Sequence, residues 1–471
     1  MKQHLTLWTM AALTSVILAC SCQNNKTKLE SVPEPSWYDY ENYFKEKTSL
    51  FSRLPIEHDD IVMLGDEIID FGEWYDFFQD TCMINRGIMF EGSPHTLYRI
   101  DEIAKAKPSK IFVSTGLADI KRVSEEEASA EADTVISNVK KIFERANALS
   151  PDTELYYIGI LADRQVSDAG VTAIAKANKH ISDWADESGL FKFIDISNLA
   201  DASGRMGEQY TFDGRSLNGL GYERVAEKVL VAGLSAYARQ YNRANDRKYK
   251  DISDAHHNRV SIFNSLPENT QSVMFLGNSI TRRGPWQELL PVVRTTNRGV
   301  GGDVLKGMYN RLDDVIAANP IAIFIMGGIN DLTKPESNVD AVWKDYENLL
   351  AKLKKELPET RLYIQSTLPV TAEFDKDTVI NAKVAELNKY LKAAEVKYEY
   401  RFVDVAARLS DEEGNLRPEF TLDGLHLMPA AYFEWCTEII EQTPVFLLMQ
   451  LQHALDYQNL QEQIEQTENL Q

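Results

Sequence analysis

The chain is poor in cysteine and has no excess of positive charge, and each shortage argues against a class of protein. It has 4 cysteines in 471 residues. Cys22, Cys82 and Cys436 are far apart and unevenly placed, so they form neither a disulfide framework nor a zinc ligand set. The formal net charge of −21 at pH 7 argues against a nucleic-acid partner, because phosphate binding needs a clustered basic face.

Long hydrophobic runs are also missing after Cys20, so no transmembrane helix is predicted there. The preceding run, "LTLWTMAALTSVILAC", has the length of a signal peptide's apolar region, and its "ILAC" end resembles a bacterial lipoprotein signal. The resemblance implies a signal peptide at 1–19 and a diacylglycerol on Cys20. The stretch at 20–36 is polar and contains proline, so it is predicted to be a linker. The lipoprotein resemblance also implies an exported protein anchored in the outer membrane. The sequence does not indicate whether the anchor is on the periplasmic or the outer face of that membrane. An ordinary secretory signal or an uncleaved anchor is the alternative.

The remaining chain is a tandem duplication. Its halves match at a constant offset of 212 residues, since Gly65 pairs with Gly277 and 277 − 65 = 212. The same offset pairs "NRG" at 85–87 with "NRG" at 297–299, and near the ends "YTFDG" matches "FTLDG" at a slightly smaller offset. Fixed-period self-similarity over this length indicates repeated structural units. We therefore predict two domains at 37–245 and 246–445, followed by a helical tail at 446–471.

Each half alternates short apolar runs with amphipathic stretches. In the second half the runs are "SVMFLG", "IAIFIMGG", "RLYIQSTL" and "YRFVDV", separated by helix-like segments such as "NVDAVWKDYENLLAKLKKEL". Continuous apolar strands separated by helices indicate a parallel sheet covered on both faces. The sequence thus predicts two three-layer α/β/α domains with central parallel sheets. His256 and His257 are expected on the surface of a helix before the second sheet.

Four strand ends of the second half carry residues suited to acyl transfer. Ser279 follows the first strand, Gly302 the second and Asn330 the third, while Asp423 and His426 follow the last. Ligands of open parallel sheets bind beyond the carboxyl ends of the strands, so we expect these residues at one edge. A hydroxyl, a carboxylate-backed imidazole, an amide and a flexible backbone N–H are the parts of an acyl-transfer site.

In this order the motifs "GNSIT", "NRGVGGD", "GGIND" and "DGLHL" resemble those of the SGNH (GDSL-type) hydrolase family. The similarity is to the branch with platelet-activating-factor acetylhydrolase-like and sialate O-acetylesterase-like members. It implies a flavodoxin-like fold, with Ser279 as nucleophile, His426 as general base and Asp423 orienting His426. The N–H groups of Ser279 and Gly302 and the Asn330 amide would form the oxyanion hole. Such a site needs no metal and no cofactor.

The first half carries none of the groups that react. At the matching positions it has Glu67, Phe90, Ala118, Asp213 and Ser216, of which only Asp213 retains the residue type. Phe90 is expected to put a ring where the oxyanion donor would stand, and Ala118 has no side-chain donor. The first half is therefore interpreted as a pseudoenzyme domain.

Two roles for this pseudoenzyme domain are open. One is a packing partner that supports the second domain, which we favour. The other is carbohydrate binding, with Phe90, Trp74 or Tyr98 stacking on sugar and Glu67 accepting hydrogen bonds from hydroxyl groups.

The sequence predicts a serine esterase that hydrolyses small O-acyl esters through an acyl-Ser279 intermediate. The family resemblance implies acetyl esters, on carbohydrate. A lysophospholipase or short-chain lipid esterase is the alternative among enzymes. A non-catalytic glycan-binding surface lipoprotein is the alternative outside them. The expected partners are an acetylated glycan and, through the lipid anchor, a membrane; the sequence does not indicate an oligomeric state.

Overall fold

The computed structural model describes residues 29–79, 82–234, 253–266, 272–291, 293–334, 336–377 and 379–443. The predicted signal peptide at 1–19, the lipidated Cys20 and the helical tail at 446–471 lie outside the described residues. Among the helices in the described ranges, none has the length and apolar character needed to span a bilayer.

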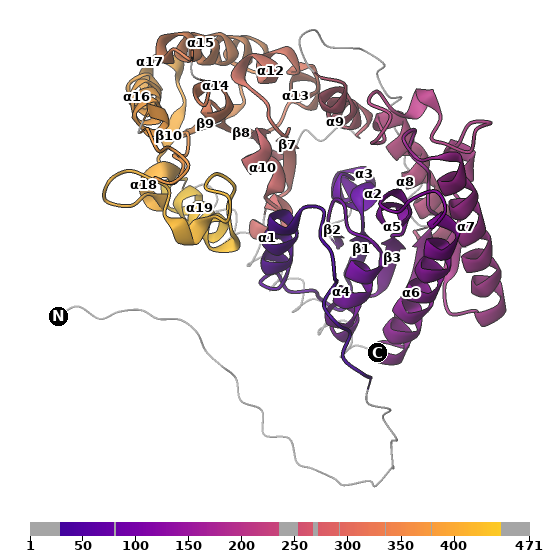
Figure 1. Cartoon of the computed structure of the whole chain (residues 1–471). Helices are drawn as coiled ribbons and strands as arrows, with labels where there is room; N and C mark the ends of the chain where they lie inside the picture. Colours follow the sequence, from indigo (N-terminus) through magenta and orange to yellow (C-terminus); the bar gives the residue numbers. More distant parts are fainter. Residues whose placement is uncertain are drawn as a thin grey trace, which may run out of the picture. The chain divides into compact units, whose positions relative to one another are not determined.

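Two five-stranded sheets form the centres of the two halves (Figure 1). Every strand pair is parallel. The first sheet has the order β2-β1-β3-β4-β5 and the second has β7-β6-β8-β9-β10, which is the same topology. The strands are β1 Ile61–Gly65, β2 Met83–Gly87, β3 Lys110–Ser114, β4 Glu154–Ile158, β5 Lys192–Ile194, β6 Val273–Gly277, β7 Thr295–Gly299, β8 Ala322–Met326, β9 Arg361–Gln365 and β10 Arg401–Val403.

Helices cover both faces of each sheet. The first-half helices are α1 Glu41–Phe51, α2 Glu67–Asp70, α3 Trp74–Phe78, α4 Ser93–Lys105, α5 Leu117–Lys121, α6 Ala128–Leu149, α7 Asp168–Ser188 and α8 Gly219–Gly233. Those of the second half are α9 Asp254–Ser265, α10 Ser279–Arg283, α11 Trp286–Leu289, α12 Leu305–Asn310, α13 Asp313–Ala318, α14 Ile329–Leu332, α15 Val339–Glu356, α16 Val379–Ala393, α17 Glu395–Tyr398, α18 Val405–Leu409 and α19 Pro429–Gln442. The predicted α/β fold with central parallel sheets is confirmed.

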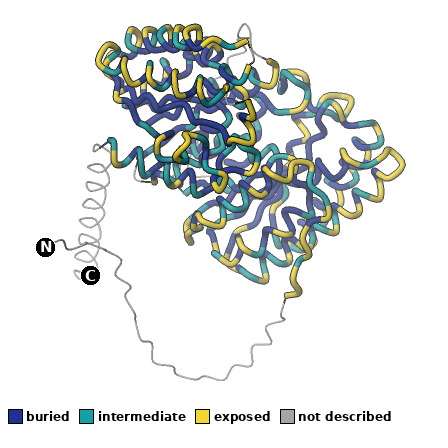
Figure 2. Tube along the Cα trace, turned by 60° about the vertical axis from the view of Figure 1, so that its left-hand side comes forward, coloured by how far each residue is buried: buried dark blue, intermediate teal, exposed yellow. Residues whose placement is uncertain are grey.

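The strands are buried because both of their faces are covered. All five residues of β1, β6 and β8 are buried, which explains their continuous apolar sequences. Figure 2 shows buried residues through the interior of the molecule and exposed residues mainly on its outer helices and loops. The register also repeats, since Gly65 pairs with Gly87 as Gly277 pairs with Gly299. The repeat found in the sequence therefore corresponds to the same strand register in the two sheets.

The helix that precedes the second sheet packs on the first half. Gly219 of α8 donates its N–H to Ser261 Oγ of α9 at 2.8 Å. A Cβ atom on Gly219 would lie 2.1 Å from the Ser261 carbonyl oxygen, so only glycine permits this approach. Apolar residues of α9 join the core of the first half: Val260, Ile262 and Phe263. The predicted boundary at 246 stays a prediction, but α9 packs with the first core.

The predicted helix at α9 is confirmed, whereas the surface placement of its histidines is wrong. His257 is 6% exposed, and the half-buried His256 donates from Nε2 to the Gly301 carbonyl at 2.6 Å. Both side chains are covered because α9 lies between the two halves. The sequence pattern shows an apolar face on this helix but does not show that two different surfaces contact it.

Two buried ion pairs join the halves in matching positions. Arg86 bonds both carboxylate oxygens of Glu288, at 2.8 and 2.7 Å, and Arg298 pairs with Asp76 at 3.0 Å. The two pairs occupy equivalent positions of the repeat: Arg86 matches Arg298, since 86 + 212 = 298, and Asp76 matches Glu288, since 76 + 212 = 288. Self-complementary contacts of this kind are typical of a two-fold interface.

Candidate active site

Ser279 is the first residue of α10, directly beyond the end of β6. The side chain of Asn278 caps this short helix by accepting the Ile280 N–H at 3.0 Å. Tyr432 of α19 donates its hydroxyl to the Ile280 carbonyl at 2.7 Å, which fixes the first turn from outside. The hydroxyl of Ser279 is thereby held at the carboxyl edge of the sheet, as the sequence predicts.

His426 and Asp423 reach Ser279 from the loop before α19. His426 Nε2 lies 3.0 Å from Ser279 Oγ, and Nδ1 lies 2.6 Å from Asp423 Oδ2. The other oxygen of Asp423 accepts the N–H groups of Leu425 and His426 at 2.9 and 2.7 Å. One carboxylate therefore shapes the turn and fixes the ring, which is why both residues fit in a short segment.

The electrostatics of this pair favour a charged carboxylate. Partial burial of Asp423 acts to raise its pKa, but the hydrogen bonds and charge of His426 outweigh it, so the pKa of Asp423 is lower than usual. An ionised Asp423 accepts from Nδ1–H and leaves Nε2 as the acceptor that faces the serine hydroxyl. This is the tautomer that a general base requires.

The two remaining predicted residues belong to one loop region. Gly302 lies beyond β7 with φ +72°, a conformation that side-chain-bearing residues rarely adopt. Asn330, in α14, donates from Nδ2 to the Asp303 carbonyl at 2.8 Å, so its amide is held beside the residue that follows Gly302. An amide carries two N–H groups, and this bond uses one of them. The structure thus brings together Ser279, Asp423 and His426, and places Gly302 and Asn330 together.

Sequence reasoning missed the residues that support this loop. Arg311 donates to Asp303 Oδ2 at 2.7 Å and to the Gly277 carbonyl at 3.0 Å, and neither Arg311 nor Asp303 is more than a few per cent exposed. This buried pair ties the loop after β7 to the end of β6. His256 Nε2 donates to the Gly301 carbonyl in the same loop. The sequence shows only that Asp303 and Arg311 are eight residues apart. That spacing by itself does not indicate an ion pair.

A comparison with protein-family models matches residues 275–432 to the GDSL-like lipase/acylhydrolase family. The matched region contains the whole Ser279–His426–Asp423 arrangement. The second half of the chain is a member of the GDSL-like (SGNH) hydrolase family.

Similar proteins were found among curated and solved proteins. Platelet-activating factor acetylhydrolase IB subunit alpha2 of Rattus norvegicus is 24% identical over 215 residues, 43% of this chain and 90% of that protein. N-acylneuraminate cytidylyltransferase of Escherichia coli is 25% identical over 199 residues, 42% of this chain and 46% of that protein. The chain thus spans about half the length of this second relative.

Two solved structures are also similar to the chain. A GDSL-like lipase from Bacteroides thetaiotaomicron has 21% identity and a TM-score of 0.34, covering 38% of this chain and 92% of its own. An acetylxylan esterase from Geobacillus stearothermophilus has 18% identity and a TM-score of 0.32, covering 37% of this chain and 95% of its own.

The first half keeps the backbone of the hydrolase site without its reactive groups. Glu67 begins α2 as Ser279 begins α10, and Asp213 caps its turn by accepting the Arg215 and Ser216 N–H groups at 2.8 and 2.9 Å. Ser216 stands where His426 would be, and Ala118 is 7% exposed within α5. The turn carboxylate is retained because it organises the loop in both halves.

The expectation that the Phe90 ring stands where the oxyanion donor would be stays a prediction. Phe90 has φ +66°, close to the +72° of Gly302, so the backbone at this position is retained in spite of the side chain. Burial raises the pKa of the Glu67 carboxyl group, and the backbone N–H groups of Glu67 and Phe90 act in the opposite direction. The first half therefore keeps the backbone angle of this position, while its nucleophile position carries a carboxylate.

Two of the three aromatic residues considered for sugar stacking lie elsewhere. Trp74 is 1% exposed, and its indole N–H donates to the Ile69 carbonyl at 2.9 Å. Tyr98 is exposed but lines a separate cavity near α1 and α4. Phe90 alone of the three lines the first-half cleft, with 42% of its surface exposed.

The described residues hold no cluster of three or more His, Cys, Asp or Glu side chains suited to a metal ion. In the described part of the chain Cys82 and Cys436 form no disulfide, and burial raises the pKa of Cys436. Neither lies among the residues of the candidate site.

Proposed function

We propose that the second half of the chain is a serine esterase that hydrolyses small O-acyl esters, with O-acetyl groups on carbohydrate as its substrate class. The observation that carries this proposal is the relay from Asp423 Oδ2 to His426 at 2.6 Å and from His426 to Ser279 Oγ at 3.0 Å. A serine hydroxyl is a weak nucleophile at its free pKa and needs a base at this range.

In the first step, Ser279 Oγ attacks the ester carbonyl carbon while His426 Nε2 takes the hydroxyl proton. The carbonyl oxygen becomes an oxyanion, which the N–H groups of Ser279 and Gly302 and the Asn330 amide are suited to bind. Asp423 stays ionised and stabilises the imidazolium that forms on His426.

In the second step, the bond to the leaving alcohol breaks and the His426 proton passes to the departing oxygen. The acyl group is then an ester of Ser279. Water attacks this acyl-enzyme with His426 again as base, and the proton returns to Ser279 Oγ as the carboxylic acid leaves. Each proton removed is thus delivered, and the enzyme is restored without a cofactor.

The acetyl and carbohydrate assignments have separate support. The rat relative is named as an acetylhydrolase, and the Escherichia coli relative is named for N-acylneuraminate, a sugar. The motifs of the second half also resemble those of sialate O-acetylesterase-like proteins. Attachment to a membrane through Cys20 remains part of the proposal, and export would place the site outside the cytoplasm.

The test is acetate release by the purified protein and its variants. Ser279→Ala should lower turnover of an acetyl ester by about 10⁴-fold or more. Asn330→Ala should lower it by about 10²- to 10³-fold. Ser216→Ala, at the first-half position that matches His426, is the control and should retain full activity. Full activity of Ser279→Ala would contradict the nucleophile assignment.

The substrate class is tested with a panel of acetylated xylo-oligosaccharides, O-acetylated sialic acid and lysophosphatidylcholine. We expect acetate from the acetylated sugars at the highest kcat/KM. Preferred release of fatty acid from lysophosphatidylcholine would instead identify a lysophospholipase.

A further inference from the structure

The cleft of the first half remains open after the loss of its chemistry. It has a volume of about 480 Å³, within the range of sites that hold small molecules. It lies beyond the strand ends of the first sheet, at the place that matches the catalytic edge of the second. Val300 and Gly301, from the loop after β7, form part of its wall.

The first half has gained charged side chains along this cleft. By the 212-residue offset, Glu67 replaces Ser279 and Lys121 replaces Thr333. Shared backbone contacts place Asp163 at the position of Val370, because Arg164 N–H bonds the Gly214 carbonyl as Thr371 N–H bonds that of Gly424. The fourth replacement, in the loop after those glycines, is Arg215 for Leu425. All four charged residues line the cleft.

These replacements are unlike those of a cleft that serves only for packing. A packing surface gains stability by filling with apolar side chains, whereas burial of charge is unfavourable unless the charge is paired. Asp163 is 2% exposed and forms an ion pair with Lys121. The gained charges comprise two carboxylates and two cations, so together they add no net charge to the wall.

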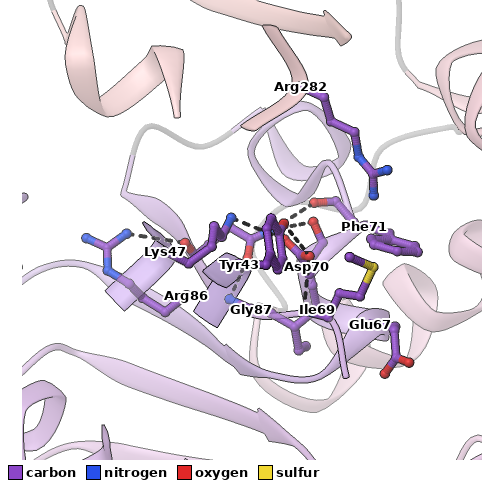
Figure 3. A network of polar contacts seen from close by, with 12 residues as sticks. Tyr43, Lys47, Glu67, Ile69, Asp70, Phe71, Arg86, Gly87 and Arg282 are labelled. Carbon is purple, nitrogen blue, oxygen red and sulfur yellow. Dashed lines mark hydrogen bonds and ion pairs between the residues drawn. The ribbon is translucent and has the colours of Figure 1, made fainter. Parts of the chain in front are cut away.

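Glu67 presents an unused acceptor in this cleft. Burial raises the pKa of its carboxyl group, while the N–H groups of Glu67 and Phe90 and the charge of Lys121 oppose that rise. Its Oε2 atom is buried and has no hydrogen-bond partner among the described residues. Figure 3 shows Glu67 apart from the network in which Tyr43 and Lys47 bind Asp70. Buried acceptors in folded proteins have hydrogen-bond partners, so this atom is available to a water molecule or to a donor of a ligand.

Phe90 supplies an apolar surface on the same wall. Its backbone has φ +66°, which is strained for a residue with a side chain, and the residue is 42% exposed. Strain of this kind persists where surrounding structure enforces it and is concentrated at functional sites. An exposed ring beside paired hydrogen-bonding groups matches a molecule with hydroxyl groups on its edge and C–H groups on its face.

We propose that the first-half cleft binds a neutral saccharide of one or two sugar units, with Phe90 against a sugar face and Glu67 accepting a hydroxyl hydrogen bond. Lys121, Asp163 and Arg215 supply further donors and acceptors whose charges balance. This site is distinct from the proposed esterase site and does not depend on it.

The test is saturation-transfer NMR on the full chain carrying Ser279→Ala, so that no acyl hydrolysis interferes. The probes are xylose, galactose, N-acetylglucosamine, xylobiose and cellobiose, with glucuronic acid as an anionic comparison. We expect transfer to at least one neutral sugar and weaker or no transfer to glucuronic acid. Binding should not differ between the Ser279→Ala protein and the unmodified chain, which separates this site from the esterase site.

Phe90→Gly is the decisive variant, because glycine accepts the positive φ and leaves the backbone intact. It should weaken binding of the neutral sugar at least tenfold, and Glu67→Gln at least fivefold. Tyr98→Ala is the matched control, since Tyr98 has the same exposed fraction of 42% and lines a different cavity. Tyr98→Ala should leave binding unchanged.

Three results would overturn the proposal. The first is no transfer to any neutral sugar at millimolar concentration. The second is transfer that Phe90→Gly leaves unaltered, and the third is a preference for glucuronic acid. All are read without measuring esterase activity, so failure here is distinct from failure of the proposed function.

Discussion

Replacement of Asp423 by asparagine is the change that isolates the base in the second half. Asp423 Oδ1 accepts two backbone N–H groups of its turn, and Oδ2 accepts His426 Nδ1–H at 2.6 Å. Asparagine has one oxygen and one NH₂ group. The oxygen retains the turn contacts, so the NH₂ group faces Nδ1, and the imidazole must then carry its proton on Nε2. Nε2 can no longer accept the Ser279 proton.

The magnitude follows from two losses. A hydrogen bond to a charged group contributes about 1.5–3 kcal/mol, and this one is stronger in the transition state, when His426 is an imidazolium. The competent tautomer would also set the Nδ1–H against the asparagine N–H groups, which costs a further amount of about the same size. Together they approach about 5.5 kcal/mol, or about 10⁴-fold in kcat.

The assay is kcat and KM for an acetyl ester, with thermal unfolding measured on the same samples. Asp213→Asn is the matched control, because Asp213 makes the same two backbone contacts without a histidine. Both variants should unfold at similar temperatures, and only Asp423→Asn should lose activity. If Asp423→Asn kept kcat within tenfold of the unmodified protein, the role of His426 as a base held by Asp423 would be refuted.

Two further predictions concern stability. Glu288→Gln leaves the buried guanidinium of Arg86 unpaired and should lower the free energy of unfolding in urea by about 3–5 kcal/mol. Asp183→Asn, which removes an exposed pair, should change it by less than about 1 kcal/mol, and equal effects would refute the ranking. Burial raises the pKa of Asp331 to about 7, so stability from its neutral form is complete below the unfolded pKa of about 4 and is lost as pH rises through about 7. Asp331→Asn should therefore gain about 2 kcal/mol relative to the unmodified protein between pH 5 and pH 8, and a pH-independent difference in melting temperature would contradict this.

The fold could be predicted from the sequence because its signals are local or repeated. Continuous apolar runs identify strands buried on both faces, and a constant offset identifies two copies of one topology. The two copies share one strand register, as the paired glycines at the ends of β1 and β6 show, whereas the order of the strands comes from the tertiary structure.

The packing of helix α9 on the core of the first half could not be predicted in this way. Its apolar residues indicate a buried face, but the core that receives them is chosen by long-range packing. Ser261 lies against Gly219 of the preceding half because that glycine permits the approach. His256 is covered for the same reason, since α9 is held between two surfaces rather than at the edge of one.

For the candidate site, too, some properties follow from the sequence and others only from the tertiary structure. The identity and order of Ser279, Asp423 and His426 determined the chemistry that the chain can perform, because each group has a fixed reactivity. The tertiary structure alone decided that the first-half cleft stays open, that Trp74 is buried and that Phe90 keeps the backbone of a glycine. These depend on backbone angles and on contacts between distant segments, which residue types and their spacing do not fix.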